Sequence, residues 1–233
     1  MAKTVAIMQP YFLPYIGYWQ LIDLADEFIV YDNIQYTKKG WINRNRYLHE
    51  SEARLFTLPL EKASDYIDIR ERSISASFNK GRLLTQIREA YRKAPCFTAT
   101  FDLFESIVMF DERNLFLYLL HSIKAVTGYL DINTKITVSS HVNADHSLRA
   151  SDRVLAICEA IGATRYINPI GGVKLYDKEI FRLRNIQLEF LRSEAVPYQQ
   201  FGGEFAPFLS ILDVLMFNGA EKTKGVLKSY TLE

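Results

Sequence analysis

The chain of 233 residues has little cysteine and almost no net charge. Its two cysteines, Cys96 and Cys158, lie far apart and form no CxxC pair, so we expect neither a disulfide framework nor a metal site. Lysine and arginine number 28 against 27 aspartate and glutamate residues, which gives no general attraction to nucleic acid or to an anionic membrane. A reducing compartment is the simplest interpretation.

Signals for export and for known reaction types are also missing. The first apolar run, residues 5–8, is interrupted at once by Gln9 and Pro10, so it fits neither a signal peptide nor a membrane span. We expect a cytoplasmic protein that is not inserted in a membrane. The Walker A, GxGxxG, HExxH and GxSxG patterns are absent, and no standard motif assigns a reaction or a cofactor.

Aromatic residues, in contrast, are abundant, at 13% of the chain with 14 tyrosines. The hydrophobic content of 48% and the charged content of 24% are ordinary for a globular protein. No repeat, linker or low-complexity segment divides the sequence. We therefore predict a single α/β domain over residues 1–233, with a mainly helical insertion at about 80–128.

The first 32 residues predict a βαβ unit. Residues 5–8 form a short apolar strand, residues 17–25 have helical spacing, and residues 27–32 form a buried strand that ends at Asp32. This order is typical of a Rossmann-like start with parallel strands. Ligands of such sheets bind outside the carboxyl ends of the strands, where Asp32 would lie.

Periodicity predicts further elements along the chain. Pro95 breaks the helical region, and Ser151 and Gly162 would cap the clearest helix. An apolar helix at 208–217 would end at Asn218-Gly219. The predicted strands lie at 54–60, 135–140, 164–167 and 186–190, and the predicted capped helix lies at 151–162.

Residues 8–20, MQPYFLPYIGYWQ, contain two prolines, one glycine and five aromatic rings. The prolines make the loop rigid, and a glycine at a helix start allows an anion to approach the helix N-terminus. One interpretation is a ligand-binding loop, and the other is a turn whose rings pack a helix against the sheet. The residues that would contact a ligand are Gln9, Tyr11, Tyr15, Gly17 and Tyr18.

Residues 32–46, DNIQYTKKGWINRNR, follow the second predicted strand. Lysine and arginine can hold phosphates, tryptophan can stack on a base or sugar, and a strand-end aspartate can bind a hydroxyl or accept a proton. The alternative is a solvated basic loop, but the interleaved tryptophan, asparagine and glutamine favour a site. The candidates are Asp32, Gln35, Lys38, Lys39, Trp41, Asn43, Arg44 and Arg46.

Two later segments give weaker signals. Residues 168–177, NPIGGVKLYD, follow a predicted strand, and the glycine pair allows close approach of a ligand or forms a plain tight turn. Its candidates are Asn168, Gly171, Gly172 and Tyr176. Ser139, Ser140 and His141, with His146 nearby, allow acid–base chemistry at His141, although the spacing fixes no companion acid.

The sequence resembles the WbqC-like family of bacterial proteins in five segments that together span most of the chain. The family is encoded among genes for O-antigen and other surface polysaccharides, so the resemblance implies lipopolysaccharide-type biosynthesis and an activated, often amino-bearing, sugar. The segments are MQPYFLPYIGYWQLI (8–22), FIVYDNIQYTKKGWINRNR (28–46), YRKAPCF (91–97), ICEAIGATRYINPIGGVKLYD (157–177) and PYQQF with LSILDVLMFNG (197–219).

The resemblance implies a transferase that moves an acyl or aminoacyl group to the amine of a nucleotide-linked sugar. The second partner would be an acyl or aminoacyl donor or carrier, with nucleic acid involved only as an aminoacyl-tRNA, and the oligomeric state stays open. Trp41 and the tyrosines of the opening loop would face the base or sugar, and Asp32 or His141 would take the amine proton. The diphosphate would be held by Lys38, Lys39, Arg44 and Arg46.

The first βα unit is also similar, more weakly, to the nucleotidylyltransferase superfamily, which includes pantothenate synthetase. Those enzymes bind ATP phosphates with an HxGH motif, and the matching residues here, 15–18, read YIGY. The missing imidazoles argue against adenylyl transfer. Two alternatives remain: an adenylate-forming enzyme with a remodelled phosphate site, and a sugar-nucleotide binding protein without catalysis.

Overall fold

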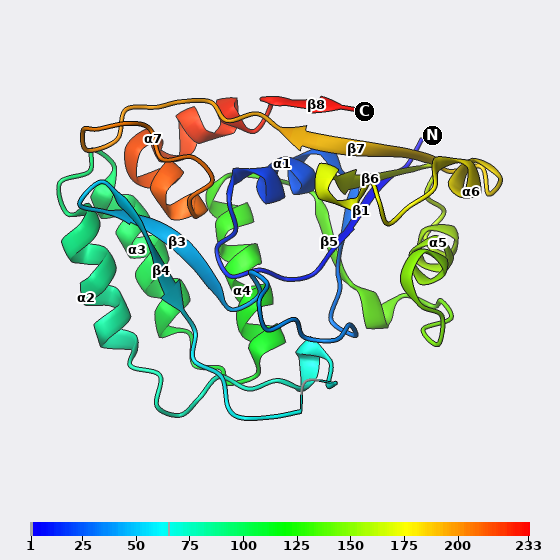
Figure 1. Ribbon diagram of the computed structural model, residues 1–233, viewed down its shortest axis with the longest axis horizontal. Coiled ribbons are helices and arrows are strands. Elements are labelled where there is room, and N and C mark those ends of the chain that lie inside the picture. The colour runs from blue at the N-terminus through cyan, green and yellow to red at the C-terminus, as the bar shows by residue number, and fades with distance from the viewer. Residues whose placement is uncertain (1, 65) are drawn as a thin grey trace.

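The computed structural model describes residues 2–64 and 66–233, and its centre is a six-stranded sheet (Figure 1). The strand order is β5-β2-β1-β6-β7-β8. Within this sheet the strands run parallel, except that β8 is antiparallel to β7. The predicted α/β class with a parallel sheet is confirmed. The strands are β1 (Thr4–Met8), β2 (Glu27–Val30), β5 (Lys135–Val138), β6 (Arg165–Pro169), β7 (Gln187–Ser193) and β8 (Tyr230–Leu232).

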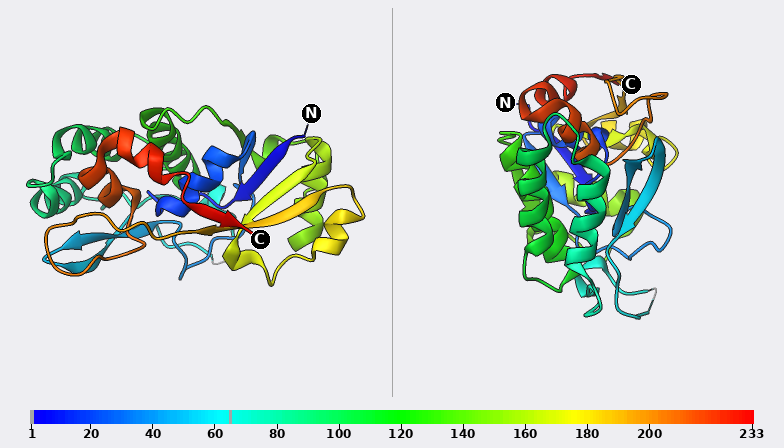
Figure 2. Two further views of the ribbon diagram at one scale, coloured as in Figure 1. Left: turned by 90° about the horizontal axis from the view of Figure 1, so that it is seen from above. Right: turned by 90° about the vertical axis from the view of Figure 1, so that its left-hand side faces the viewer.

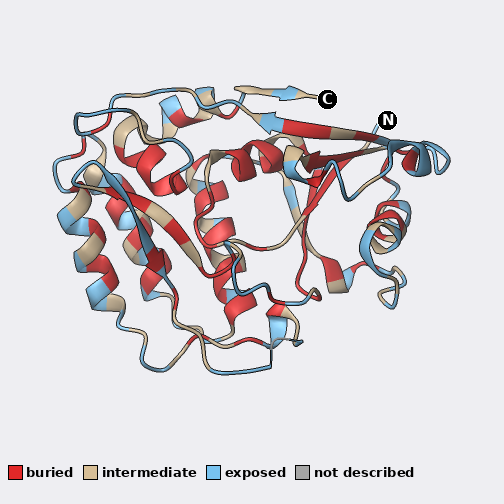
Figure 3. Cartoon of the chain, viewed as in Figure 1, coloured by how far each residue is buried: buried red, intermediate tan, exposed pale blue. Residues whose placement is uncertain are grey.

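Helices cover both faces of this sheet (Figure 2). Two clusters of buried hydrophobic residues lie on opposite faces of the sheet, and the side chains of β1 alternate between them. Ala6 packs with one cluster, whereas Val5 and Ile7 pack with the other. With both faces covered, the central strands are buried along almost their whole length (Figure 3). The helices are α1 (Ile16–Leu24), α2 (Lys80–Tyr91), α3 (Phe97–Met109), α4 (Leu115–Tyr129), α5 (Ala150–Ala160), α6 (Lys178–Arg182) and α7 (Ile211–Val226).

Helices α2, α3 and α4 occupy the segment for which the sequence predicts a helical insertion, and Pro95 lies between α2 and α3. Together with α7 they form the group at the left of Figure 1, whereas α5 and α6 lie at the right. The described residues also form three short 3₁₀ turns, η1 (Ile69–Glu71), η2 (Ser139–His141) and η3 (Ile170–Gly172). No helix of the described residues is long and apolar enough to cross a membrane.

The structure differs from the predicted local structure at three places. Residues 44–49, for which no strand was predicted, form strand β3 (Arg44–His49), which pairs with β4 (Glu52–Thr57) in a separate antiparallel hairpin. The apolar helix that was predicted to end at Asn218-Gly219 begins at Ile211 and is interrupted at Gly219, whose φ of 65° is not helical, and α7 resumes beyond this kink to Val226. Helix α5 begins at Ala150, so Ser151 lies inside the helix and is not its N-cap.

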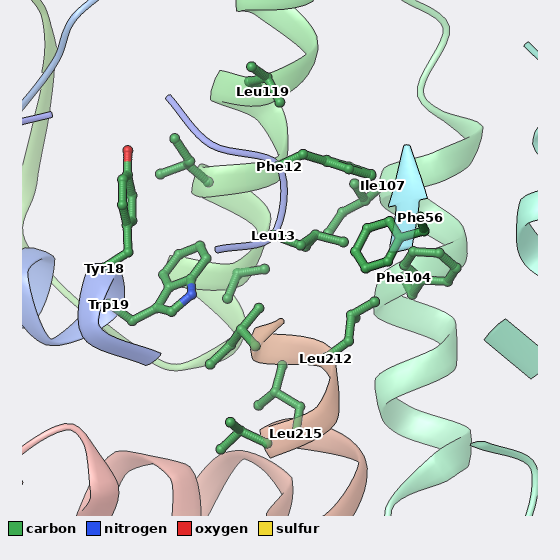
Figure 4. Packing of buried hydrophobic residues seen from close by; sticks show 14 of the residues in the cluster. Phe12, Leu13, Tyr18, Trp19, Phe56, Phe104, Ile107, Leu119, Leu212 and Leu215 are labelled. Carbon is green, nitrogen blue, oxygen red and sulfur yellow. The ribbon is translucent and has the colours of Figure 1, made fainter. Parts of the chain in front are cut away.

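The opening stretch contributes to the main core. Phe12, Leu13 and Trp19 have no exposed surface, and they pack between α1, α3, α4, α7 and β4 (Figure 4). Phe12 meets Phe56 edge to face at 5.6 Å between ring centroids, and Trp19 Nε1 donates to the Pro14 carbonyl at 3.0 Å. The packing interpretation therefore holds for these side chains.

Strand β2 begins with a buried carboxylate, Glu27. It pairs with Lys3 Nζ at 2.8 Å and Lys135 Nζ at 2.9 Å, and it accepts a hydrogen bond from Thr137 Oγ1 at 2.6 Å. Burial alone would raise the pKa of Glu27, but the bonds from Lys3, Thr137 and Lys135 lower it to about 2. Because the pKa is lower in the folded state, the stabilisation is complete above the ordinary value of 4.5 and is lost as the pH falls toward about 2.

We expect Glu27→Gln to lower the free energy of unfolding by about 1–2 kcal/mol at neutral pH, since both lysines are partly solvated. The difference from wild type should shrink as the pH falls from about 4.5 toward about 2. Urea unfolding across this range measures it, with the exposed Glu52→Gln as the control. A difference that does not change with pH would contradict the ion-pair account.

Candidate functional site

A pocket of about 710 Å³ lies beyond the carboxyl end of β2. We call it the strand-end pocket. Strand β1 has β2 on one side and β6 on the other, so the strand order reverses beside this edge, where ligands of parallel sheets bind. The walls come from four separate segments of the chain. They are Tyr31, Asn33, Ile34 and Gln35; Tyr66 and Asp68; Arg149, Ala150, Ser151, Arg153 and Val154; and Leu175 and Tyr176.

One wall of the strand-end pocket is the positive end of helix α5. No side chain of the described residues caps the first turn, and its backbone N–H groups, with the guanidinium groups of Arg149 and Arg153, give this wall the chemistry of an anion site. Arg153 is held in place, because its Nη1 donates to the Asn33 carbonyl at 2.7 Å and its Nε donates to the Leu148 carbonyl at 2.6 Å. Its guanidinium also lies 5.8 Å from the centre of the Tyr31 ring.

Two carboxylates near this wall differ in environment. Asp32 is 3% exposed and accepts hydrogen bonds from Ser139 Oγ at 2.7 Å and from the Ser140 N–H at 2.9 Å. Burial would raise the pKa of Asp32, but these bonds outweigh it and lower the pKa. Asp68 lines the pocket, and burial raises its pKa despite the opposing charge of Arg70. Of the two carboxylates, Asp68 thus has the higher pKa and is the stronger base.

The two histidines of the β5–α5 connection have different positions. His146 accepts from Asn33 Nδ2 at 3.0 Å through Nδ1 and donates from Nε2 to the Val142 carbonyl at 2.9 Å, if Nε2 carries the proton. Both of its nitrogens are therefore engaged in fixing the loop. His141 is exposed on η2 and is not among the described residues that line the strand-end pocket.

A second, smaller pocket of about 200 Å³ lies between the opening loop, the start of β3 and the segment before α7. We call it the aromatic pocket. Four of the predicted ligand-contacting residues, from two distant stretches of sequence, meet there. It is lined by Tyr11, Pro14, Tyr15, Trp41, Asn45, Arg46 and Phe208.

Other predicted residues support these pockets from behind. Tyr18 is 2% exposed and donates to the Gln9 carbonyl at 3.0 Å. Gly17 gives room to the Tyr15 ring, which a Cβ at position 17 would meet at 2.5 Å. Asn43 is buried, accepts from Tyr36 Oη at 2.8 Å and donates to the Leu58 carbonyl at 2.7 Å.

The predicted basic cluster does not converge on one point. Lys38 and Lys39 are exposed on the turn before Trp41. Arg44 donates from Nε to the Gly40 carbonyl at 3.0 Å, which closes this turn. Of this group, Arg46 alone lines the aromatic pocket, and none lines the strand-end pocket within the described chain.

The candidate residues of the segment NPIGGVKLYD also lie in different environments. Tyr176 lines the strand-end pocket, as does Gln35 of the earlier segment. Asn168 is buried and donates to Tyr166 Oη at 2.7 Å. A Cβ at Gly172 would lie 1.9 Å from Asn168 Oδ1, so this glycine makes room for a side chain of the protein itself. Gly171 is exposed, and a Cβ at this position would meet no atom of the described residues within 4 Å.

Most residues of the strand-end pocket were not among the candidates chosen from the sequence, including Tyr31, Asp68, Arg149 and Arg153. The one available signal was the pair of arginines at the start of the clearest helix, after a predicted strand. These residues define the class of the protein, an α/β protein with an arginine-lined crevice at the ends of its parallel strands.

Comparison with known proteins places the chain in a family. The model of the WbqC-like protein family matches residues 9–225, and the chain belongs to this family. It is 31% identical over 223 residues to the uncharacterized protein Rv1507c of Mycobacterium tuberculosis (strain ATCC 25618 / H37Rv), a match that covers 94% of this chain and 95% of that protein. No solved structure matches. The predicted family is confirmed, whereas the resemblance to nucleotidylyltransferases stays a prediction.

Proposed function

We propose that the protein is an enzyme of surface-polysaccharide assembly that transfers an acyl or aminoacyl group to the amine of a nucleotide-linked sugar. One observation carries the proposal: the strand-end pocket combines an anion-binding wall, Arg149 and Arg153 at the start of α5, with a carboxylate of raised pKa, Asp68. The phosphates bind the wall, and the hydroxyls of Tyr31 and Tyr176 are suited to a sugar.

The proposed reaction forms one bond and breaks one. The sugar nitrogen attacks the acyl carbonyl carbon, a C–N bond forms, and the bond from that carbon to the donor's leaving group breaks. The amine proton passes to Asp68 and from there to the leaving group, which leaves Asp68 ready for another cycle. Asp68 replaces Asp32 and His141 in this role, because Asp32 is held as an acceptor by Ser139 and Ser140 and its pKa is lowered.

A thermal-shift screen tests the proposal. A nucleotide sugar at about a hundredfold excess over its Kd should stabilise the protein by about 2.7 kcal/mol and raise Tm by roughly 5–10 °C. Arg149→Ala should reduce this shift, whereas Lys222→Ala, an exposed cation on α7, should retain it. Failure of every nucleotide sugar to raise Tm would contradict the proposal.

Mass spectrometry of the bound sugar, after addition of acyl donors, separates the proposal from its alternatives. An increase in sugar mass by the acyl group supports transfer. Binding without any mass change would indicate a binding protein without catalysis. Release of pyrophosphate from ATP would indicate an adenylate-forming enzyme.

A further inference from the structure

The aromatic pocket is a second binding site, apart from the strand-end pocket. We propose that it binds a nucleobase, and in particular one that carries a carbonyl oxygen. This inference rests on the proposed function for the presence of a nucleotide and goes beyond it by assigning the base to a site. It is carried by the rings, the size and the charge of the pocket.

Two rings of the pocket are exposed to an unusual degree. Trp41 is 41% exposed and Phe208 is 51% exposed, although aromatic side chains of this size are usually more deeply buried. Tyr15 meets Phe208 edge to face at 6.0 Å between centroids, so these two rings hold each other at the rim. A volume of about 200 Å³ exceeds the roughly 150 Å³ of a cavity that accepts benzene, so a heterocyclic base fits.

The charge of the pocket decides which kind of ring it takes. An aromatic cage often holds a cation, but here the guanidinium of Arg46 lies 5.4 Å from the centre of the Trp41 ring and that of Arg44 lies 6.0 Å away. A cationic ligand would be repelled by both arginines. A neutral planar ring can stack on tryptophan and on guanidinium, as bases do in nucleic-acid binding proteins.

Arg46 also offers donors to a carbonyl oxygen. Its Nη2 donates to the Phe208 carbonyl at 3.1 Å, which is the guanidinium's one hydrogen bond to the described residues. Its Nε is buried without a partner among the described residues, so the donors left for an acceptor on the ligand are those of the terminal nitrogens. Asn45, in contrast, is used up, because its Nδ2 donates to the Phe12 and Leu13 carbonyls and its Oδ1 accepts from the Arg46 N–H. Arg46 therefore favours uracil, cytosine and guanine over adenine, which has no carbonyl group.

The two pockets begin at neighbouring strand ends. Met8 of β1 and Val30 of β2 are partners in the parallel register. Tyr31, which directly follows Val30, lines the strand-end pocket, and Tyr11, three residues beyond Met8, lines the aromatic pocket. The base can thus belong to the nucleotide-linked sugar itself or to a second nucleotide. Competition between the nucleotide sugar and uridine separates these two sources.

Tryptophan fluorescence tests the proposal, because Trp19 is fully buried and Trp41 alone is exposed to a ligand. Uridine and guanosine should quench the emission saturably, adenosine about tenfold more weakly, and ribose not at all. Trp41→Phe should abolish the quenching while the Trp19 emission reports an intact fold. Arg46→Met should remove the preference for bases with a carbonyl group and leave a weaker, stacking contribution.

The outcomes for the two proposals are distinct. Equal binding of uridine and ribose, or unchanged quenching in Arg46→Met, would overturn the base site while the thermal shift with nucleotide sugars stands. Quenching by nucleosides without any thermal shift from nucleotide sugars would overturn the proposed function alone. If the base belongs to the nucleotide sugar, that compound quenches Trp41 and competes with uridine; if it belongs to a second nucleotide, both bind together.

Discussion

Asp213→Ala is expected to lower the free energy of unfolding by about 3–5 kcal/mol, the largest effect of a single substitution that we predict. Asp213 has no exposed surface and lies in the first turn of α7. Its carboxylate accepts hydrogen bonds from Tyr91 Oη at 2.7 Å, Tyr198 Oη at 2.5 Å and Gln200 Nε2 at 2.7 Å. These bonds join α2 and the segment before α7 to the start of α7.

The cost of Asp213→Ala comes from its partners. Alanine leaves the buried Tyr91 hydroxyl and the half-buried Tyr198 hydroxyl without their acceptor, and a buried donor left unpaired costs about 1–3 kcal/mol. The Gln200 amide also loses a bond but keeps the Ala206 carbonyl as an acceptor at 3.3 Å. Tyr198→Phe removes a single bond and should cost about 1 kcal/mol. Asp111→Ala, at an exposed aspartate, is the matched control and should change the free energy by less than about 0.5 kcal/mol. Urea unfolding measures all three, and equal values for Asp213→Ala and Asp111→Ala would contradict this account.

The sheet and the family were predictable from the sequence because their signals are local. Residues 5–8 and 28–30 are short apolar runs bounded by polar or turn residues, and parallel strands that are buried on both faces have this pattern. The order of strand, helix and strand then fixed their parallel pairing, which the register from Val5↔Glu27 to Met8↔Val30 reproduces.

The hairpin was not predictable, because its signals are concealed. In β3 the charged side chains of Arg44 and Arg46 alternate with buried Asn45 and Tyr47, so polarity hides the period of two. Its turn residues, Glu50 and Ser51, have positive φ values of 51° and 62°. Neither is glycine or asparagine, the residues from which such a turn is usually predicted. For this reason no strand was predicted over the basic, polar stretch.

The candidate sites were predictable only as separate lists of residues. The sequence singled out Tyr11, Tyr15, Trp41 and Arg46, yet nothing local indicates that Phe208 completes their pocket. The strand-end pocket likewise depends on four segments that the topology alone brings together. Residue chemistry can be read from a sequence, whereas the convergence of distant segments follows from the strand order.

Arg153→Ala is expected to weaken binding of the nucleotide sugar by about 10–100-fold, since a charge-assisted bond to phosphate contributes about 1.5–3 kcal/mol. It should also lower the free energy of unfolding by about 1–3 kcal/mol, because the Asn33 and Leu148 carbonyls lose their donor. Calorimetric titration and urea unfolding measure the two effects. Arg153→Lys should restore little of either, because an ammonium cannot reproduce the planar fork that reaches both carbonyls.

Arg149→Ala separates these two consequences, because Arg149 is exposed and makes no side-chain hydrogen bond to the described residues. It should weaken binding by about tenfold and leave the free energy of unfolding within about 0.5 kcal/mol of wild type. If both variants bind the nucleotide sugar as wild type does, the start of α5 is not the phosphate site. If only Arg153→Ala weakens binding, and the loss of binding free energy does not exceed the loss of unfolding free energy, then Arg153 does not contact phosphate. It then acts by holding α5 against the end of β2.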